Sequence, residues 1–135
     1  MSFYKVFDVA GSALNAQQVR MNVTASNLAN AGSVNGNENA VYRARQPMFE
    51  TFRDSMDSSL AGVRVTGINE SDAPLATRYE PNHPSANAEG NVYVSNVNTV
   101  EEMVNMISAS RSYQNNVEIV NTTKDLLLQT LQMGR

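Results

Sequence analysis

His83 is the only histidine of the chain and the first residue to consider for catalytic or metal chemistry. Its sequence neighbours are Pro and Asn, whereas a catalytic or metal-bound histidine needs a partner that orients its ring or shares the ion. The chain has no cysteine, which excludes disulfides, thiol catalysis and cysteine-based metal sites. We therefore interpret His83 as a loop residue, and only burial beside two carboxylates would return it to a catalytic role.

The adjacent acids Glu101 and Glu102 are a second candidate for acid–base chemistry. Adjacent residues of a helix point in different directions, so this pair does not converge on one substrate. Thr99 lies three residues before Glu102, which is the spacing of a capping box at the start of a helix. The chain also lacks a Gly-rich phosphate loop and a nucleophile elbow. The sequence predicts a protein that is not an enzyme and has no cofactor and no metal.

Four arginines of the middle segment could bind an acidic partner, or they could form a solvated face balanced by nearby acids. The net charge is −3 and no basic block is present, which gives nucleic acid binding no electrostatic basis. We favour the solvated face. The arginines are Arg43, Arg45, Arg53 and Arg64, and the acids are Glu50, Asp54 and Asp57.

The last third of the chain, residues 98–135, carries the apolar periodicity of one long helix. Within each of two columns the residues are seven positions apart. The second column lies three positions after the first and four before its next member, as in a coiled coil or a helical bundle. A third column widens this stripe on one flank, so we expect more than one neighbour. The first column is Val100, Ile107, Gln114, Asn121 and Leu128; the second is Met103, Ser110, Val117, Lys124 and Leu131; the flank is Met106, Tyr113, Val120 and Leu127.

Residues 2–31 predict a second long helix. Phe7, Leu14, Met21 and Leu28 recur every seven residues, and a column of smaller or polar residues lies between them. Gly11 falls inside this helix at a cost of roughly 1 kcal/mol relative to Ala, either as a tolerated flaw or as a point of close contact. We expect Gly32 to end the helix in the left-handed conformation.

The middle of the chain reads as short strands and loops. Residues 62–68 alternate as a strand does, and residues 91–94 and a segment ending at Tyr79 predict two more. A strand near residues 41–45 is limited to a sheet edge by Pro47. Residues 49–60 predict a short helix or a loop.

These elements predict an α+β fold of elongated shape. Helices of about 29 and 36 residues would span ~45 and ~54 Å, too long to enclose in a compact ball with the remaining chain. We expect them to pair as an antiparallel coiled-coil-like hairpin, giving a helical domain from residues 1–32 and 97–135 and a β-rich domain from residues 33–96. Polar residues in the stripe would fix the register of that pairing: Gln17, Thr24, Gln114 and Asn121.

Three motifs resemble the axial proteins of the bacterial flagellum. Residues 25–31 read ASNLANA and are similar to the N-terminal signature of that family, and residues 106–118 are similar to its C-terminal signature. Residues 79–84 and 90–98 resemble the proximal members of the basal-body rod proteins. The Asn-rich loop over residues 32–42 is longer than in many axial proteins, and Asn91 stands where the family often has an aromatic residue. The signature positions are Ser26, Asn27, Leu28, Ala29, Asn30, Ser110, Arg111, Tyr113 and Gln114.

The resemblance implies a structural subunit of the flagellar basal-body rod, the periplasmic shaft that carries motor torque. It implies export through the flagellar type III apparatus without a cleaved signal peptide. It also implies as partners other proximal and distal rod subunits, the rod–ring adaptor protein and copies of itself. No apolar run is long enough for membrane insertion.

We expect the helical stripes to pack on each other and on neighbouring subunits. Two alternatives remain: another axial subunit of the same family, or a soluble helical-hairpin adaptor that closes as a dimer. The residues predicted to carry subunit packing are Phe7, Leu14, Met21, Leu28, Val100, Ile107, Val117, Leu128 and Leu131.

Overall fold

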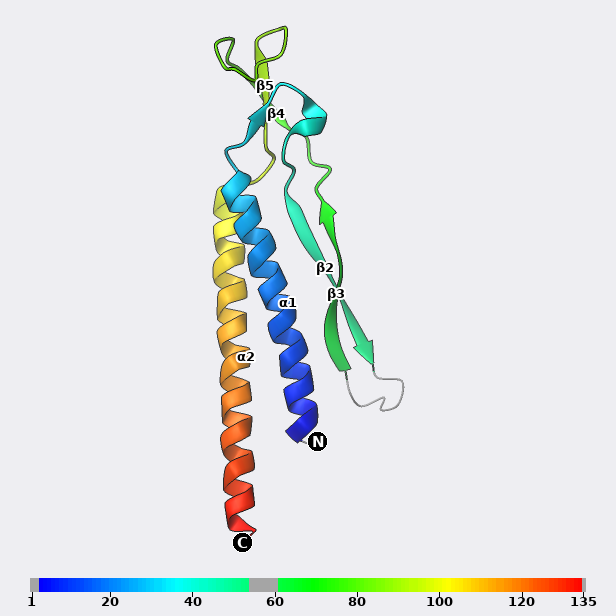
Figure 1. Cartoon of the computed structure of the whole chain (residues 1–135), viewed down its shortest axis with the longest axis vertical. Coiled ribbons are helices and arrows are strands. Elements are labelled where there is room, and N and C mark those ends of the chain that lie inside the picture. The colour runs from blue at the N-terminus through cyan, green and yellow to red at the C-terminus, as the bar shows by residue number, and fades with distance from the viewer. Residues whose placement is uncertain (1–2, 54–60, 135) are drawn as a thin grey trace.

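A computed structural model describes residues 3–53 and 61–134 and shows an elongated molecule built along two helices (Figure 1). Helix α1 spans Phe3–Asn30 and helix α2 spans Thr99–Met133. The two helices lie side by side and run in opposite directions, with α2 continuing past the start of α1 (Figure 1). The predicted antiparallel hairpin and the α+β class are confirmed.

The helix ends differ from their predicted caps. The side chain of Asn98 accepts hydrogen bonds from the backbone N–H groups of Val100 and Glu101, at 3.1 and 3.3 Å, so Asn98 rather than Thr99 is the N-cap of α2. Gly32 does not adopt the left-handed conformation, since Gly90 is the only described residue with positive φ. Helix α1 ends at Asn30, whose side-chain amide donates to the carbonyl of Ser26 in the last turn.

Strands β2, Arg45–Arg53, and β3, Ala61–Glu70, form a two-stranded antiparallel ribbon that packs along α1 (Figure 1). The predicted strand at residues 62–68 is confirmed and lies within β3. The strand expected near residues 41–45 begins only at Arg45, and residues 49–53 continue it instead of forming a helix or loop. Pro47 fits because each strand of a two-stranded ribbon has a free edge. Residues 54–60, the rest of that prediction, lie outside the described residues.

A three-stranded antiparallel sheet stands at the end of the hairpin where α1 ends and α2 begins (Figure 1). Its order is β1, Val34–Asn35, then β5, Asn91–Val94, then β4, Ala76–Tyr79. A short 3-10 helix, η1, Glu38–Ala40, follows β1. The central strand contributes Val92, which is fully buried and is the core of this small sheet. The predicted strands at residues 91–94 and before residue 79 are confirmed.

The face of α2 that contacts α1 is not the one expected. Residues of the predicted flank lie half-buried, and they alternate by three and four with buried or half-buried residues along the same face. Because α2 packs chiefly against α1, this is the intrachain seam. Ala109, fully buried, lets the helices approach closely there. The seam residues of α2 are Glu102, Met106, Ala109, Tyr113, Asn116, Val120, Thr123 and Leu127.

Candidate assembly interface

Asn27, in the last turn of α1, is the centre of a buried polar cluster and is only 1% exposed. Its side-chain amide donates to the backbone carbonyl of Arg45 at 2.8 Å and to the carboxylate of Glu102 at 3.1 Å. Its oxygen accepts from the hydroxyl of Tyr42 at 2.8 Å and from the backbone N–H of Arg45 at 2.9 Å. These four bonds use the full capacity of an asparagine amide. Asn27 therefore joins α1, α2 and the start of β2 at one point.

Three further contacts hold the start of β2 and the segment before it in place. The guanidinium of Arg45 lies 5.3 Å from the ring centre of Tyr42 and is paired with Glu70 of β3 at 3.1 Å. The side-chain oxygen of Asn96 accepts from the backbone N–H of Ala44 at 2.7 Å. Side-chain amides thus connect the start of the ribbon to the end of α1, through Asn27, and to the segment before α2, through Asn96.

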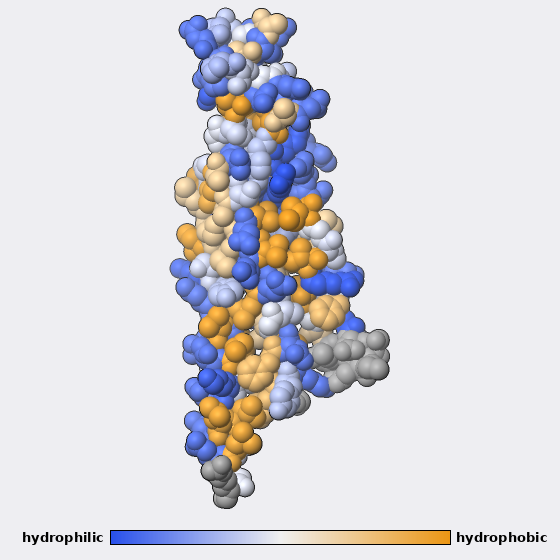
Figure 2. All heavy atoms as spheres, in the orientation of Figure 1, coloured by the Kyte–Doolittle hydropathy of each residue, from blue (hydrophilic) through white to orange (hydrophobic). Residues whose placement is uncertain are grey.

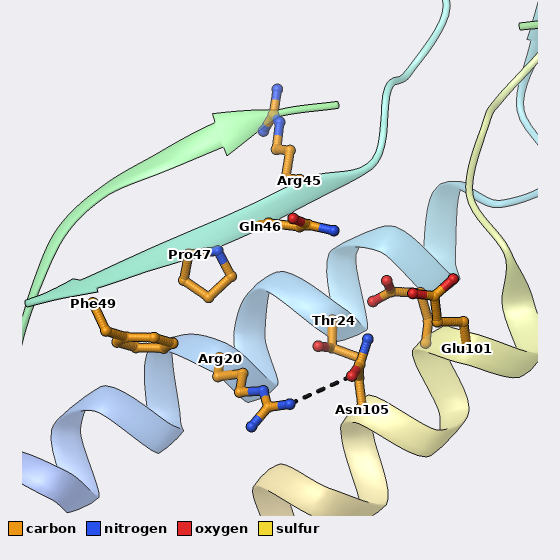
Figure 3. A pocket seen from close by; sticks show the side chains of 9 residues that line it. Arg20, Thr24, Arg45, Gln46, Pro47, Phe49, Glu101 and Asn105 are labelled. Carbon is orange, nitrogen blue, oxygen red and sulfur yellow. Dashed lines mark hydrogen bonds between the residues drawn. The ribbon is translucent and has the colours of Figure 1, made fainter. Parts of the chain in front are cut away.

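A polar hollow of about 420 Å³ lies beside this cluster, between α1, the first turns of α2 and β2. Figure 3 shows Arg20 reaching across it to Asn105, a bond of 3.4 Å, with Thr24 and Glu101 on its rim. Among the described residues, no group of three or more acidic, histidine or cysteine side chains could hold a metal ion. The hollow is lined by hydrogen-bonding side chains from α1, α2 and β2.

His83 has the loop role that its neighbours predict. It is half-buried in the turn between β4 and β5, and its ring Nδ1 accepts a hydrogen bond from the backbone N–H of Ser85 at 3.1 Å. The structure places no pair of carboxylates beside it among the contacts of the described residues. The ring closes a local turn.

The middle arginines form dispersed ion pairs. Arg64 pairs with Glu50 at 2.9 Å across the ribbon, and Arg43 lies 3.7 Å from Glu38. The expectation that Glu50 balances this face is confirmed, whereas Asp54 and Asp57 lie outside the described residues. Exposed pairs of this kind contribute little to stability, about 0–1 kcal/mol each. A solvated face, and not a single basic patch, is what these arginines form.

The side of α2 that points away from α1 is apolar over its first turns. Val100 is 69% exposed and Ile107 is 56% exposed, and Met103 and Val104 lie on the same side and are also exposed. A helix that packs against a partner with one face normally carries polar residues on its opposite face. Four large apolar residues on that opposite face are therefore unusual for a hairpin without further contacts. We call these four residues the outward face of α2.

The predicted packing residues divide into two groups. Val100, Ile107, Leu128 and Leu131 are exposed and are not part of the seam with α1, and Val117 is half-buried. Their packing on neighbouring subunits stays a prediction. On α1 the predicted residues are all half-buried: Phe7, Leu14, Met21 and Leu28. Figure 2 shows apolar surface along the far part of α2 and where the ribbon meets the helices.

The signature residues lie on both sides of each helix. Tyr113 belongs to the seam toward α1, Ser110 is half-buried, and Arg111 and Gln114 are exposed. In the first signature, Asn27 is buried and Ser26, Leu28 and Asn30 are half-buried, while Ala29 is exposed. Sequence reasoning missed the cluster that joins Asn27 to Glu102 and Tyr42. Its only signal was an asparagine between apolar helix positions.

No helix in the described residues is both long and apolar enough to cross a membrane.

Comparison with known proteins identifies the family to which the chain belongs. The family model described as flagella basal body rod protein matches residues 7–36, and that of the flagellar basal body rod FlgEFG protein C-terminal matches residues 88–133. The flagellar basal-body rod protein FlgC of Escherichia coli O157:H7 is 50% identical over 135 residues, covering all of both chains. Those of Salmonella typhimurium and Yersinia enterocolitica are 49% and 50% identical over the same full length. The chain belongs to the FlgC family of flagellar basal-body rod proteins, structural subunits of the rod that serve motility.

Proposed function

We propose that this chain is a subunit of the proximal rod and that its terminal helices form the wall of a helical tube around the export channel. In this proposal residues 1–32 and 97–135 make the wall, and residues 33–96 lie outside it. The observation that carries the proposal is the outward face of α2, four large apolar residues that the described part of the chain leaves 55–69% exposed. A neighbouring subunit is the cover that an assembling structural protein would supply.

The energetic gain of covering this face is substantial. Fully burying one large apolar side chain contributes about 1.5–3 kcal/mol, so four partly exposed ones offer several kcal/mol per contact. Association also costs translational and rotational freedom, which a single small contact does not offset. We therefore expect each subunit to use several contacts, including the half-buried α1 residues Phe7, Leu14, Met21 and Leu28 and the exposed ends of α2 at Leu128 and Leu131.

Transmission of torque requires the subunit to resist shear. Close-packed side chains resist deformation, and the α1–α2 seam supplies them along most of the helix length. The Asn27 cluster adds a fixed point between the hairpin and the ribbon. Load that enters through the helices would reach the ribbon through this cluster.

The specific partners and the route of export complete the proposal. We propose that the subunit contacts copies of itself, other proximal and distal rod proteins, and the rod–ring adaptor protein. We propose further that it reaches the periplasm through the flagellar export apparatus without a cleaved signal peptide. Heterologous contacts that do not close would then build the tube without added instruction.

The experiment that tests this proposal introduces a charged side chain into the apolar surface of α2. Ile107→Asp or Leu128→Asp should abolish rod assembly and motility while the chain is still exported, because a buried carboxylate without a partner is strongly unfavourable. Asn82→Asp adds the same charge in the exposed loop between β4 and β5 and should leave swimming unchanged. Normal swimming of both helix variants would refute the packing proposal.

A discrete closed dimer is the rival state. Sedimentation of the purified chain distinguishes the two, since a rod subunit without its neighbours should be monomeric. A stable dimer at micromolar concentration would favour the adaptor.

A further inference from the structure

Arg111 and Asp8 are exposed charged residues that form no hydrogen bond or ion pair in the described part of the chain. Arg111 lies one helical turn beyond Ile107, so it continues the outward face of α2. Asp8 is on α1, whose other two charged residues are Lys5 and Arg20, and Arg20 is directed toward α2 through Asn105. Asp8 is the only acidic residue of α1, and Arg111 is the only charged residue within four positions of Ile107 on α2, so the two charges are opposite. The other exposed charged residues of α2 lie farther from Ile107 along the helix: Glu101, Glu118, Lys124 and Asp125.

Gly11 lies one turn from Asp8 on the same exposed side of α1. A Cβ added there would meet no atom within 4 Å, so none of the described residues requires a glycine at this position. Glycine inside a helix costs roughly 1 kcal/mol relative to alanine. A backbone without a side chain, on an open face, suits close approach by a bulky residue from outside.

The two exposed surfaces match in order and spacing. Ile107 and Arg111 are four residues apart on α2, and Gly11 and Asp8 are three residues apart on α1. If two copies stand in the same orientation, α2 of one runs opposite to α1 of the other, so Ile107 meets Gly11 where Arg111 meets Asp8. The spacings of about 6 and 4.5 Å differ by less than the reach of an arginine side chain.

We propose that the outward face of α2 in one copy packs on the exposed side of α1 in a second copy, with Ile107 against Gly11 and Arg111 paired with Asp8. The charge complementarity selects the second copy as the occupant, and the pair would be partly desolvated by the apolar residues around it. This inference rests on the proposed function, for which it names the lateral contact.

The contact fixes an axial displacement between neighbours. Within one chain Glu102 lies beside Asn27, which places Arg111 level with about residue 18, ten residues from Asp8. To form the ion pair, the second copy must therefore be shifted by ~15 Å along the helix axis. A shifted contact between different surfaces does not close on itself and produces a helix of subunits. A level contact would instead place Ile107 opposite Asn22 and Arg111 opposite Gln18, with no opposite charge.

A cysteine pair tests the register, because the chain has no cysteine of its own. Gly11→Cys with Ile107→Cys should give a ladder of covalent multimers of this chain in isolated basal bodies treated with a mild oxidant. A disulfide needs Cα atoms within about 7 Å, which the two positions can meet only between copies. Asn22→Cys with Ile107→Cys is the matched control for the level register. A ladder from the control pair and none from the first pair would overturn the proposal.

Charge exchange gives a second readout that does not depend on cysteine. Arg111→Glu and Asp8→Arg should each reduce incorporation into basal bodies at least several-fold, and the double variant should restore it. Failure of the double variant to recover, with both single variants impaired, contradicts the pairing. If the unchanged chain does not incorporate at all, the proposed function itself fails; if it incorporates but neither test gives the stated result, only the lateral contact fails.

Discussion

The side-chain amide of Asn27 and the carboxylate of Glu102 meet 3.1 Å apart between α1 and α2, and both side chains are buried, at 1% and 7% exposed. The sequence predicts Glu102 as a capping residue, whereas Asn27 lies outside the seven-residue apolar column of α1. Glu102 does not complete a capping box; it receives a hydrogen bond from the opposite helix. One polar contact therefore fixes how far the two helices slide along each other.

Replacing Asn27 by Leu should destabilise the chain strongly. It leaves the carboxylate of Glu102 and the N–H and C=O of Arg45 without the Asn27 amide, while the hydroxyl of Tyr42 keeps its hydrogen bond to the hydroxyl of Ser26. Each unsatisfied buried group costs about 1–3 kcal/mol. We expect a loss of at least ~3 kcal/mol in the free energy of unfolding, measured by urea denaturation. Asn22→Leu, on the exposed side of the same helix, should change it by no more than about 0.5 kcal/mol. Equal losses of unfolding free energy in the two variants would show that Asn27 has no special role.

Tyr42→Phe is a milder probe of the same cluster. The oxygen of Asn27 keeps the bond from the N–H of Arg45 and loses only the one from the hydroxyl, a change of about 1 kcal/mol. Because Tyr42 precedes β2, we expect amide hydrogens at the start of β2 to exchange faster while those of α2 change little. Uniform acceleration over the whole chain would show that the ribbon and the hairpin open together.

Asn98→Ala should weaken the start of α2. The Asn98 side chain satisfies two backbone N–H groups, and loss of an N-cap costs about 1 kcal/mol. Thermal unfolding followed by circular dichroism measures the change. Thr99→Ala is the control, since Thr99 would be the cap in a capping box and should be nearly neutral here. A larger effect at Thr99 than at Asn98 would restore the cap expected from the sequence.

Ala109→Leu should force the helices apart. Ala109 is fully buried in the seam, and adding bulk to a packed interface costs about 1–3 kcal/mol. Ser108→Leu adds a similar bulk on the exposed neighbouring position and should leave the unfolding temperature close to that of the unchanged chain. A stable Ala109→Leu chain would mean that the seam is looser than its burial indicates.

The sequence predicts the long helices and most strands because their periodicity extends over many residues. It does not predict which side of α2 faces α1, since both the column of Ile107 and the column of Tyr113 are apolar enough to serve. The choice depends on Ala109 and on the bond between Glu102 and Asn27, residues far apart in sequence. The strand at residues 49–53 was ambiguous for a similar reason, because its apolar residues fit more than one period and its pairing with β3 decides the outcome.

Helices α1 and α2 stand at opposite ends of the sequence, and each covers the apolar seam of the other. Closing the hairpin therefore requires a loop that contains the entire middle of the chain, which is slow to close compared with contacts between neighbouring elements. In a chain that emerges from a narrow channel with its N-terminus first, α1 would remain unpaired until the residues of α2 have also emerged. Completion of synthesis or transport and completion of folding would then coincide at the C-terminal end.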